Sequence, residues 1–294
     1  MVQEYRKGLA LNGRPGVHIM NAVVITGLAD GIGREVARLL AASKVPVAGF
    51  DVDRDGLQSL EEELAKARCD HLLMTLDIAD RPGILKFRDM VLERFGRVDV
   101  VLSNVGIGFF GPFEEVDLEK ALKCMEINVI GTAAIFQAFL PAMRENRAGK
   151  LIAMSSLVGQ IPFPFESIYS ASKFAVEGLV LSMRYEVEPF GIKVALIEPA
   201  QVSTSFAAKI HRLPPEGSPY RERARRFIAR DEELIRTAPT PIQAAAEVVK
   251  VIKARNPKLY NQIDFKSKAF LSLNRILPRP VRDAILLRQM DIRV

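Results

Sequence analysis

Cysteine and histidine are scarce in this chain of 294 residues. The two cysteines, Cys69 and Cys124, form no C-x-x-C pair, which fits a protein of a reducing compartment. The three histidines, His18, His71 and His211, are scattered along the chain. A catalytic zinc site therefore has no cluster of ligands to build from, and we expect no bound metal.

Long apolar runs are also missing. No run of eighteen apolar residues occurs, so we expect no membrane-spanning helix. The first nineteen residues carry Arg6, Lys7 and Arg14 without a continuous apolar stretch, which argues against a signal peptide. Three interpretations of this leader (1–19) remain open: an ordered arm, a disordered tail, or an artefact of start assignment. Together these features predict a cytoplasmic protein.

The positive charge is unevenly distributed. The net charge is +6, but residues 206–294 hold 19 Lys/Arg against 9 Asp/Glu, and the remainder holds 22 against 26. A basic surplus of this kind suggests an anionic partner, and a solvated basic surface is the alternative. No motif with interleaved aromatic residues appears, so nucleic acid is not expected as a partner.

A nucleotide-binding turn follows the first apolar run. Residues 21–25 are β-branched or small, a glycine-rich turn comes next, and an amphipathic helix then begins. In this context Gly27 permits a tight turn, Gly31 lets the backbone approach a pyrophosphate, and Gly33 allows close packing of helix on strand. The helix N-terminus offers N–H groups to phosphates. The residues predicted to bind the cofactor here are Thr26, Gly27, Asp30, Gly31, Ile32 and Gly33.

The next two apolar runs each end in an aspartate. Asp51 lies eighteen residues beyond Gly33, near the position where an acidic residue accepts the ribose hydroxyls. Its carboxylate would repel a 2′-phosphate, Val52 offers no compensating cation, and Asp30 is also acidic, so the pattern favours NAD over NADP. The alternative is that Asp51 only caps the helix that begins near Asp53. Asp77, after the third run, is a candidate partner for the adenine amino group.

Tyr169 and Lys173 are four residues apart, and Ser156 precedes the tyrosine by thirteen residues. Residues at i and i+4 share one helix face, so the ammonium can stand beside the phenol. A nearby cation lowers the pKa of a tyrosine toward the range useful for proton transfer. Ser156 could hydrogen-bond the oxygen of a bound alcohol or carbonyl. The alternative is an ordinary helix with a surface tyrosine and lysine.

Motifs in matching order and spacing from about residue 20 to residue 204 resemble the short-chain dehydrogenase/reductase family. They are Thr26–Gly33, Asp51, Asp77, Ser103–Gly106, Asn128, Ser156, Tyr169, Lys173 and Pro199–Thr204. The resemblance implies that Tyr169 is the catalytic acid/base, that Lys173 binds the nicotinamide ribose and lowers the pKa of the tyrosine, and that Ser156 orients the substrate. It implies that Asn128 holds a water in a proton relay. The further cofactor contacts that it implies are Ile78, Asn104, Gly106, Pro199, Val202 and Thr204.

Two positions depart from the family pattern. Ser103 stands where the family has an asparagine that steadies the central strand, and Ala200 stands where a glycine follows the proline. Neither change removes a reacting group, so we expect the chain to be active.

Apolar runs that alternate with helical patterns predict an α/β fold: a Rossmann-type, doubly wound parallel sheet of about seven strands with helices on both faces. One domain is expected over 20–265, followed by a helical extension over 266–294. The strands are predicted near 21–26, 46–51, 71–77, 98–103, 149–155, 193–198 and 258–264.

The loops beyond the strand ends are rich in phenylalanine. Such an uncharged wall suits a lipophilic substrate, although some of the rings are expected to pack under their own loops. We predict substrate contacts at Phe109, Ser156, Phe163, Gln201 and Phe206; Phe110, Phe113 and Phe165 are near them. Segment 205–238 contains several prolines, and we predict that it forms a lid that becomes ordered when substrate binds. Its arginines could meet a phosphate-bearing carrier, but ordinary helix surface is the alternative.

Residues 266–290 combine an apolar stripe with basic residues, and Pro278-Arg279-Pro280 divides them into two short amphipathic helices. A cover over the substrate pocket, a subunit contact and attachment to an anionic membrane surface remain open. The resemblance alone implies a homodimer or homotetramer, formed through the helices that precede and carry the tyrosine.

These features predict an NAD(H)-dependent oxidoreductase that moves a hydride between nicotinamide and a lipophilic alcohol or ketone. One alternative is an NADPH-dependent reductase of carrier-linked 3-ketoacyl groups, and another is a nucleotide-sensing binding protein without turnover. The intact Ser156, Tyr169 and Lys173 count against the sensor, which needs none of the three.

Overall fold

The computed structural model describes residues 20–204, 206 and 214–292. The predicted leader 1–19, residues 205 and 207–213 of the predicted lid, and the last two residues lie outside the described residues. His18 and His211 fall in these segments.

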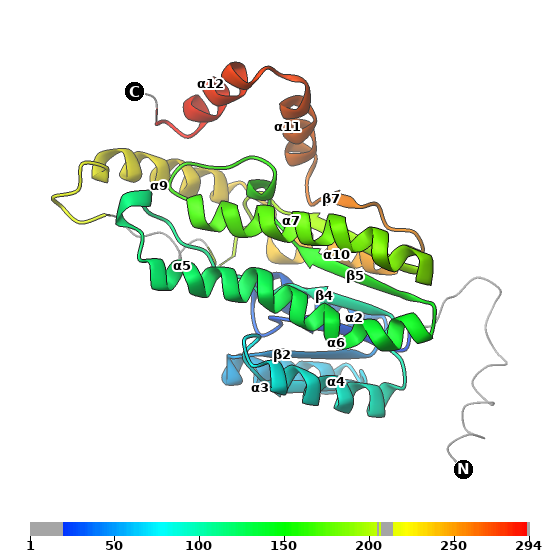
Figure 1. Cartoon of the computed structure of the whole chain (residues 1–294). Helices are drawn as coiled ribbons and strands as arrows, with labels where there is room; N and C mark the ends of the chain where they lie inside the picture. The colour runs from blue at the N-terminus through cyan, green and yellow to red at the C-terminus, as the bar shows by residue number, and fades with distance from the viewer. Residues whose placement is uncertain (1–19, 205, 207–213, 293–294) are drawn as a thin grey trace, which may run out of the picture.

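A single parallel sheet forms the centre of the molecule (Figure 1). Its strand order is β3-β2-β1-β4-β5-β6-β7, with the order reversing between β1 and β4, as in a doubly wound fold. The strands are β1 (Val23–Thr26), β2 (Val47–Asp51), β3 (His71–Thr75), β4 (Val100–Ser103), β5 (Gly149–Met154), β6 (Ile192–Glu198) and β7 (Tyr260–Gln262). The predicted sheet is confirmed, and every predicted strand is present.

Helices cover both faces of the sheet. One face carries α2 (Gly31–Ala42), α3 (Arg54–Lys66) and α10 (Pro241–Lys253). The other carries α4 (Arg81–Phe95), α6 (Gly131–Glu145) and α7 (Ser167–Val187). On this second face the rings of Phe50 and Phe87 meet edge to face with centroids 5.2 Å apart, and Phe139 continues the contact at 6.4 Å. Central strands buried on both faces explain the nearly continuous apolar runs in the sequence.

The segment before α6 is helical as well. The helix α5 (Leu118–Met125) leads into a π-helical turn, η2 (Glu126–Ile130), and α6 continues from it. By length and composition the combined helix, Leu118–Glu145, is long and apolar enough to cross a membrane, which was not expected from the apolar runs of the sequence. Half of its apolar window is buried in this fold, where it packs on α4 and α7. The core helix of a globular domain meets the same criteria.

The C-terminal extension contains two helices, α11 (Phe265–Ile276) and α12 (Arg279–Gln289), as the proline break predicts. Most of the described part of the predicted lid is a further helix, α9 (Arg221–Arg236). Figure 1 shows α12 above α9, at one end of the sheet. The Arg230 guanidinium donates to the carbonyl oxygen of Gln289 at 3.0 Å, which ties α9 to the end of α12.

A third apolar cluster, which we call the substrate-side cluster, joins these helices to the loops after β4 and β5. Its buried members are Phe110, Leu157, Val158, Ile161, Phe163, Ala224, Phe227, Leu271, Met290 and Ile292. The C-terminal extension therefore packs over the predicted substrate loops, although part of its apolar stripe stays exposed.

Candidate active site

The glycine turn between β1 and α2 has the conformation that its sequence predicts. Gly27 and Gly31 have φ values of 69° and 58°, a region that side chains rarely adopt. A Cβ atom added to Gly33 would lie 2.1 Å from the carbonyl oxygen of Gly27, so helix and turn need a glycine at that point. Asp30 caps α2 by accepting a 2.7 Å hydrogen bond from the Gly31 N–H.

Thr26 lies behind this turn rather than on its open side. Its buried hydroxyl accepts from the backbone N–H groups of Asn104 and Val105 at 3.0 and 3.1 Å. The Asn104 amide donates to the carbonyl oxygens of Thr26 and Gly27 at 3.1 and 2.8 Å. The turn after β4 thus fixes the shape of the glycine turn.

Asp51 ends β2 and faces the same open side. Its carboxylate accepts from the N–H groups of Ala29 and Asp53 at 3.0 and 3.1 Å. The helix α3 is capped by Asp53, whose side chain accepts from the Gly56 N–H at 3.0 Å. The alternative that Asp51 is the cap of this helix is therefore wrong.

The carboxyl ends of the strands border one cavity of about 540 Å³. Most predicted site residues line it: Gly27, Asp30, Gly31, Ile32, Asp51, Asp77, Ile78, Asn104, Gly106, Ser156, Phe163, Tyr169, Lys173, Pro199, Gln201, Val202, Thr204 and Phe206. The cavity has an acidic end at β1–β3 and an apolar end beside the substrate-side cluster, and the predicted catalytic groups lie between them. Such a position at the switch point of the sheet is where open α/β folds bind ligands.

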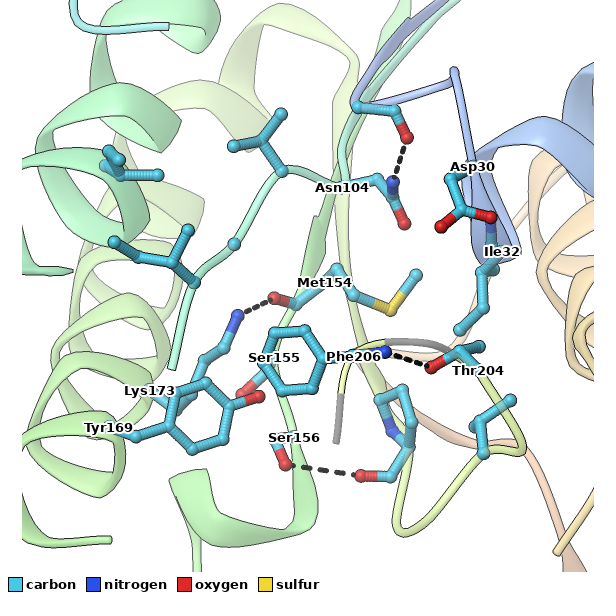
Figure 2. A pocket seen from close by; sticks show the side chains of 18 of the residues that line it. Asp30, Ile32, Asn104, Met154, Ser155, Ser156, Tyr169, Lys173, Thr204 and Phe206 are labelled. Atoms are coloured by element: carbon cyan, nitrogen blue, oxygen red, sulfur yellow. Dashed lines mark hydrogen bonds between the residues drawn. The ribbon is translucent and has the colours of Figure 1, made fainter. Parts of the chain in front are cut away.

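Tyr169 and Lys173 project from α7 toward the end of β5 (Figure 2). The Lys173 ammonium lies 5.7 Å from the centroid of the Tyr169 ring and donates to the Met154 carbonyl oxygen at 2.8 Å. Burial lowers the pKa of Lys173 to about 8. The predicted pair is therefore together in space.

The expected lowering of the tyrosine pKa is not found in the protein alone. Burial, reinforced by the negative charge of Glu166, raises the pKa of Tyr169 above its ordinary value, and a hydrogen bond with Ser156 opposes the rise only in part. The prediction considered only the lysine and left out desolvation, which here is the larger effect.

Ser156 follows β5 and lies beside the tyrosine (Figure 2). Its hydroxyl is 3.4 Å from the Pro199 carbonyl oxygen and accepts from the Val158 N–H at 3.3 Å. On the other side, the Phe206 ring lies against Tyr169 with centroids 5.7 Å apart. The phenol thus stands between a serine hydroxyl and an aromatic ring.

Asn128 lies in the π-helical turn, buried behind the cavity wall. Its amide donates to the Ile107 carbonyl oxygen at 2.8 Å and to the Ser172 hydroxyl at 2.9 Å, and its oxygen accepts from the Ile107 N–H at 2.8 Å. These bonds tie the loop after β4 to α7. The proton-relay role stays a prediction.

The shortened side chain at Ser103 still anchors its strand. Its hydroxyl is 2.9 Å from the Thr132 hydroxyl on α6, and both residues are buried. This departure from the family pattern therefore leaves the central strand attached to its helix.

The phenylalanines divide between the cavity and the core. Phe163 and Phe206 line the cavity, as predicted, but Phe109 is not among its lining residues, and Phe113 is exposed. Phe110, Phe165 and Phe227 pack on one another with centroids 5.2 to 5.8 Å apart. The alternation of the loop turns Phe110 rather than Phe109 inward, toward α9.

Two carboxyl groups in the cavity wall, Glu166 and Asp231, were not predicted from the sequence. Glu166 is three residues before the tyrosine, and this spacing on one helix face was a usable signal. Asp231 gave no signal, since it is one charge among many in a polar helix. Beneath Lys173 a buried glutamate, Glu177, was also missed; it accepts from the Ser155 hydroxyl at 2.6 Å.

The cavity fits a nicotinamide nucleotide by the chemistry of its donors and acceptors. The glycine turn and the N-terminus of α2 would hold the phosphates. Asp51 would accept the ribose hydroxyls, and Lys173 would reach the second ribose. A Cβ atom added to Gly106 would lie 3.3 Å from the Lys173 nitrogen, so a larger residue there would press on the lysine.

The model of the family described as short chain dehydrogenase matches residues 21–213. The chain belongs to the short-chain dehydrogenase/reductase family. The dehydrogenase/reductase SDR family member 7B of Bos taurus is 34% identical over 214 residues, which cover 70% of this chain and 65% of that protein. The human 17-beta-hydroxysteroid dehydrogenase type 1 is 32% identical over 266 residues, which cover 86% of this chain and 80% of that protein.

A solved short-chain dehydrogenase from Streptomyces avermitilis has the same fold, with a TM-score of 0.75, 28% identity, and coverage of 92% of this chain and 95% of that one. Members of the short-chain dehydrogenase/reductase family are oxidoreductases, and solved structures with this fold were determined in complex with NAD or with NADP. The chain spans about two thirds of the length of the mammalian relative named first.

Proposed function

We propose that this short-chain dehydrogenase/reductase is an NAD(H)-dependent oxidoreductase acting on a lipophilic alcohol or ketone. The observation that carries the proposal is the position of Tyr169, between the acidic end of the cavity and its apolar end, with Ser156 and Lys173 beside it. The nucleotide supplies the acceptor or donor of the hydride. The chain supplies a proton site at the phenol oxygen and a hydroxyl that orients the substrate oxygen.

The proton path follows from the same three side chains. In oxidation the alcohol proton passes to the Tyr169 oxygen, and in reduction the phenol returns it to the carbonyl oxygen. Burial raises the pKa of Tyr169, so formation of the phenolate depends on positive charge nearby. Lys173, whose ammonium lies 5.7 Å from the ring centroid, supplies such a charge. Ser156 would hold the reacting oxygen in reach of the phenol.

The choice of NAD over NADP is supported by the charges of the cavity wall. Asp51 and Asp30 are acidic at the ribose end. Among the described residues that line the cavity, Lys173 is the sole Lys or Arg, and it lies at the far end of the nucleotide site. A 2′-phosphate would therefore meet the Asp51 carboxylate, with no Lys or Arg beside it among the described residues that line this end. Titration with both nucleotides tests this choice, and equal affinities would refute it.

A lipophilic substrate is supported by the apolar end of the cavity, where Leu157, Val158, Phe163, Phe206 and Ile235 meet. The name of the human relative, a hydroxysteroid dehydrogenase, points to the same class of substrate. A panel of alcohols and ketones of graded size, followed by nicotinamide absorbance, tests the proposal. Absence of turnover across the panel with intact NAD binding would favour a nucleotide-sensing protein.

We further propose a homodimer or homotetramer. The α5–α6 helix and α7 leave large apolar side chains exposed, among them Leu118 at 72% and Tyr185 at 71%. A second copy of the chain would cover such a surface. Sedimentation of wild type and a Leu122→Glu variant tests this: the variant should shift toward the monomer, and a monomeric wild type would refute the proposal.

A peripheral contact with anionic membrane from the cytoplasmic side is also proposed for the C-terminal helices. On α11, Leu273 and Ile276 are exposed one turn apart, and Val281 and Ile285 are exposed on α12. Lys268 and Arg279 are exposed on the same two helices. Each cation near such a surface contributes about 1 kcal/mol.

Vesicles with and without anionic lipid test the membrane contact. Substituting Ile276→Ser together with Arg279→Gln should weaken sedimentation with the anionic vesicles. Point substitutions are preferable to removing the helices, because Leu271 and Met290 are buried in the substrate-side cluster. Equal binding to neutral and anionic vesicles, or none to either, would refute the contact.

A further inference from the structure

A network of buried polar side chains joins α7 to the ends of β5 and β6. Glu177, on α7 and one turn beyond Lys173, is 5% exposed, and Glu198, the last residue of β6, is 0% exposed. Neither glutamate is among the lining residues of the cavity, so the proton path proposed above uses neither of them. Burying an ionisable group is costly unless hydrogen bonds compensate it, so the contacts of the two side chains decide what they can do.

Each end of this network holds a chain segment of the candidate active site. The Ser155 hydroxyl donates to the Glu177 carboxyl at 2.6 Å, and the next residue in the chain is Ser156. Glu198 is followed by Pro199, whose carbonyl oxygen lies 3.4 Å from the Ser156 hydroxyl. Ser155, Ser156 and Pro199 all line the cavity. The two glutamates therefore hold the neighbours of the residues that would orient the substrate oxygen and border the nucleotide.

The donors of the network determine which carboxyl holds a proton. One oxygen of Glu198 accepts from the Gln160 amide, and the other accepts from the Gln262 amide. The Glu198 carboxyl is also hydrogen-bonded to the Glu177 carboxyl. Two carboxyl groups can make that bond only with a proton between them, because an ionised carboxylate is an acceptor alone. Since both oxygens of Glu198 already accept, the proton belongs to Glu177, which donates it to Glu198 and accepts from Ser155.

The surroundings of Glu177 favour the same state. Burial raises the pKa of its carboxyl, the charge of Glu198 raises that pKa further, and Ser155 and the Lys173 ammonium oppose the rise only in part. Among the described residues, the charged groups that act on it are therefore Lys173 from α7 and Glu198 from β6. On the side of the turn after β5, a Cβ atom added to Gly159 would lie 2.7 Å from the Ser155 hydroxyl oxygen and 3.2 Å from a Glu177 oxygen. The hydrogen bond between Ser155 and Glu177 is therefore tightly enclosed.

Resting on the proposed function, we propose that Glu177 is a positioning residue for hydride transfer, which in its protonated form bridges Ser155 and Glu198 and so fixes the ends of β5 and β6. Its effect passes to the substrate through Ser156 and to the nucleotide through Pro199. Loss of the proton would leave two carboxylates in contact, and their repulsion would separate the two strand ends. The folded protein holds this proton at neutral pH, and the bridge is lost as pH rises through the raised pKa of Glu177.

The test uses a substitution that copies the protonated acid. In Glu177→Gln the amide oxygen can accept from Ser155 and the amide nitrogen can donate to Glu198, with no proton to lose. Glu177→Leu keeps a similar volume and removes both hydrogen bonds. Glu186→Gln and Glu186→Leu, at an exposed position of the same helix, are the matched controls. For each protein kcat/KM is measured with NAD and an accepted alcohol across neutral and alkaline pH, and the affinity for NADH is measured by fluorescence titration, which needs no turnover.

Glu177→Gln should keep most of the wild-type kcat/KM at neutral pH, whereas Glu177→Leu should lose on the order of tenfold to a hundredfold, because the reacting groups are misplaced. The ratio of kcat/KM in Glu177→Gln to that in wild type should rise with pH, by up to about tenfold per pH unit above the pKa of Glu177. The affinity for NADH should fall in Glu177→Leu and not in Glu177→Gln. Both Glu186 variants should follow wild type at every pH.

A Glu177→Gln variant as slow as Glu177→Leu would overturn the proposal, because the ionised carboxylate would then be the form that is needed. A constant ratio of Glu177→Gln to wild type across the pH range would also overturn it, and this comparison holds even if the leucine variant does not fold. If wild type turns over no alcohol or ketone while NADH affinity falls in Glu177→Leu alone, the result counts against the proposed function and leaves the bridge standing. Without turnover, equal NADH affinities in all the proteins would overturn the bridge as well.

Discussion

Replacing Glu166 with glutamine should make the fold more stable at alkaline pH. The pKa of this buried carboxyl is raised to about 8, whereas the unfolded chain titrates near 4.5. Between these values the folded state keeps a proton that the unfolded state has released. The free energy of unfolding therefore falls as pH rises through this interval, by up to about 1.4 kcal/mol per pH unit. Glutamine resembles the protonated acid and cannot ionise.

The magnitude follows from the width of the interval. Wild type and Glu166→Gln should be about equally stable near pH 4.5, and the variant should be more stable by roughly 3–5 kcal/mol above pH 8. Other groups that titrate in the same range, such as Glu177, are present in both proteins and cancel in the difference. Stability is measured by urea unfolding at a series of pH values and one protein concentration.

Glu232→Gln, exposed on α9, is the control and should show no such divergence. Parallel curves for wild type and Glu166→Gln would mean that Glu166 ionises near its ordinary value. That result would refute the reasoning that its carboxyl is desolvated in the cavity.

Three further predictions concern the catalytic and cofactor groups. Tyr169→Phe should keep NAD binding and lose about 10²–10⁴-fold in turnover, since it removes the acid/base, and a near-normal rate on a verified substrate would contradict the mechanism. Lys173→Met should reduce turnover and weaken NAD binding. Because burial lowers the pKa of the lysine to about 8, the same variant should raise the free energy of unfolding near pH 7 by about 1–3 kcal/mol. Urea unfolding measures this change, and a lower free energy of unfolding in the variant would contradict the prediction. Asp51→Ala should narrow the preference for NAD over NADP, and a cation added at Val52 should narrow it further, as measured by titration with both nucleotides.

The sheet and the catalytic groups were predictable because they depend on local patterns. Apolar runs at regular intervals, a glycine turn between strand and helix, and a tyrosine and lysine one turn apart are all visible within short windows. The acid pair of the cavity was not predictable in this way. Glu166 and Asp231 are brought together by α9, whose place over the cavity depends on Phe110, Phe165 and Phe227 packing across distant parts of the chain.

The pKa of Tyr169 shows a second limit. Helical spacing placed a lysine beside the phenol, and that was confirmed, but spacing says nothing about how much water reaches the ring. Desolvation depends on the whole cavity wall, including Phe206 from the loop after β6. The predicted direction of the shift in the Tyr169 pKa was therefore wrong, although Lys173 was correctly predicted as its neighbour.

The π-helical turn at Glu126–Ile130 is the place where the α5–α6 helix could lose one residue in evolution. The Gly131 N–H donates to the Glu126 carbonyl five residues back, so the turn holds one residue more than an α-helix would, and Asn128 lies within it. An α-helix advances about 100° per residue, and the wide turn accommodates its extra residue without rotating the flanking helices by that angle. Deleting a single residue there would restore an α-helical turn, so Leu118 and Leu122 would keep their side of the helix. Such a deletion should displace Asn128 but leave the exposed apolar surface in place, whereas a one-residue deletion within α6 should reorient that surface.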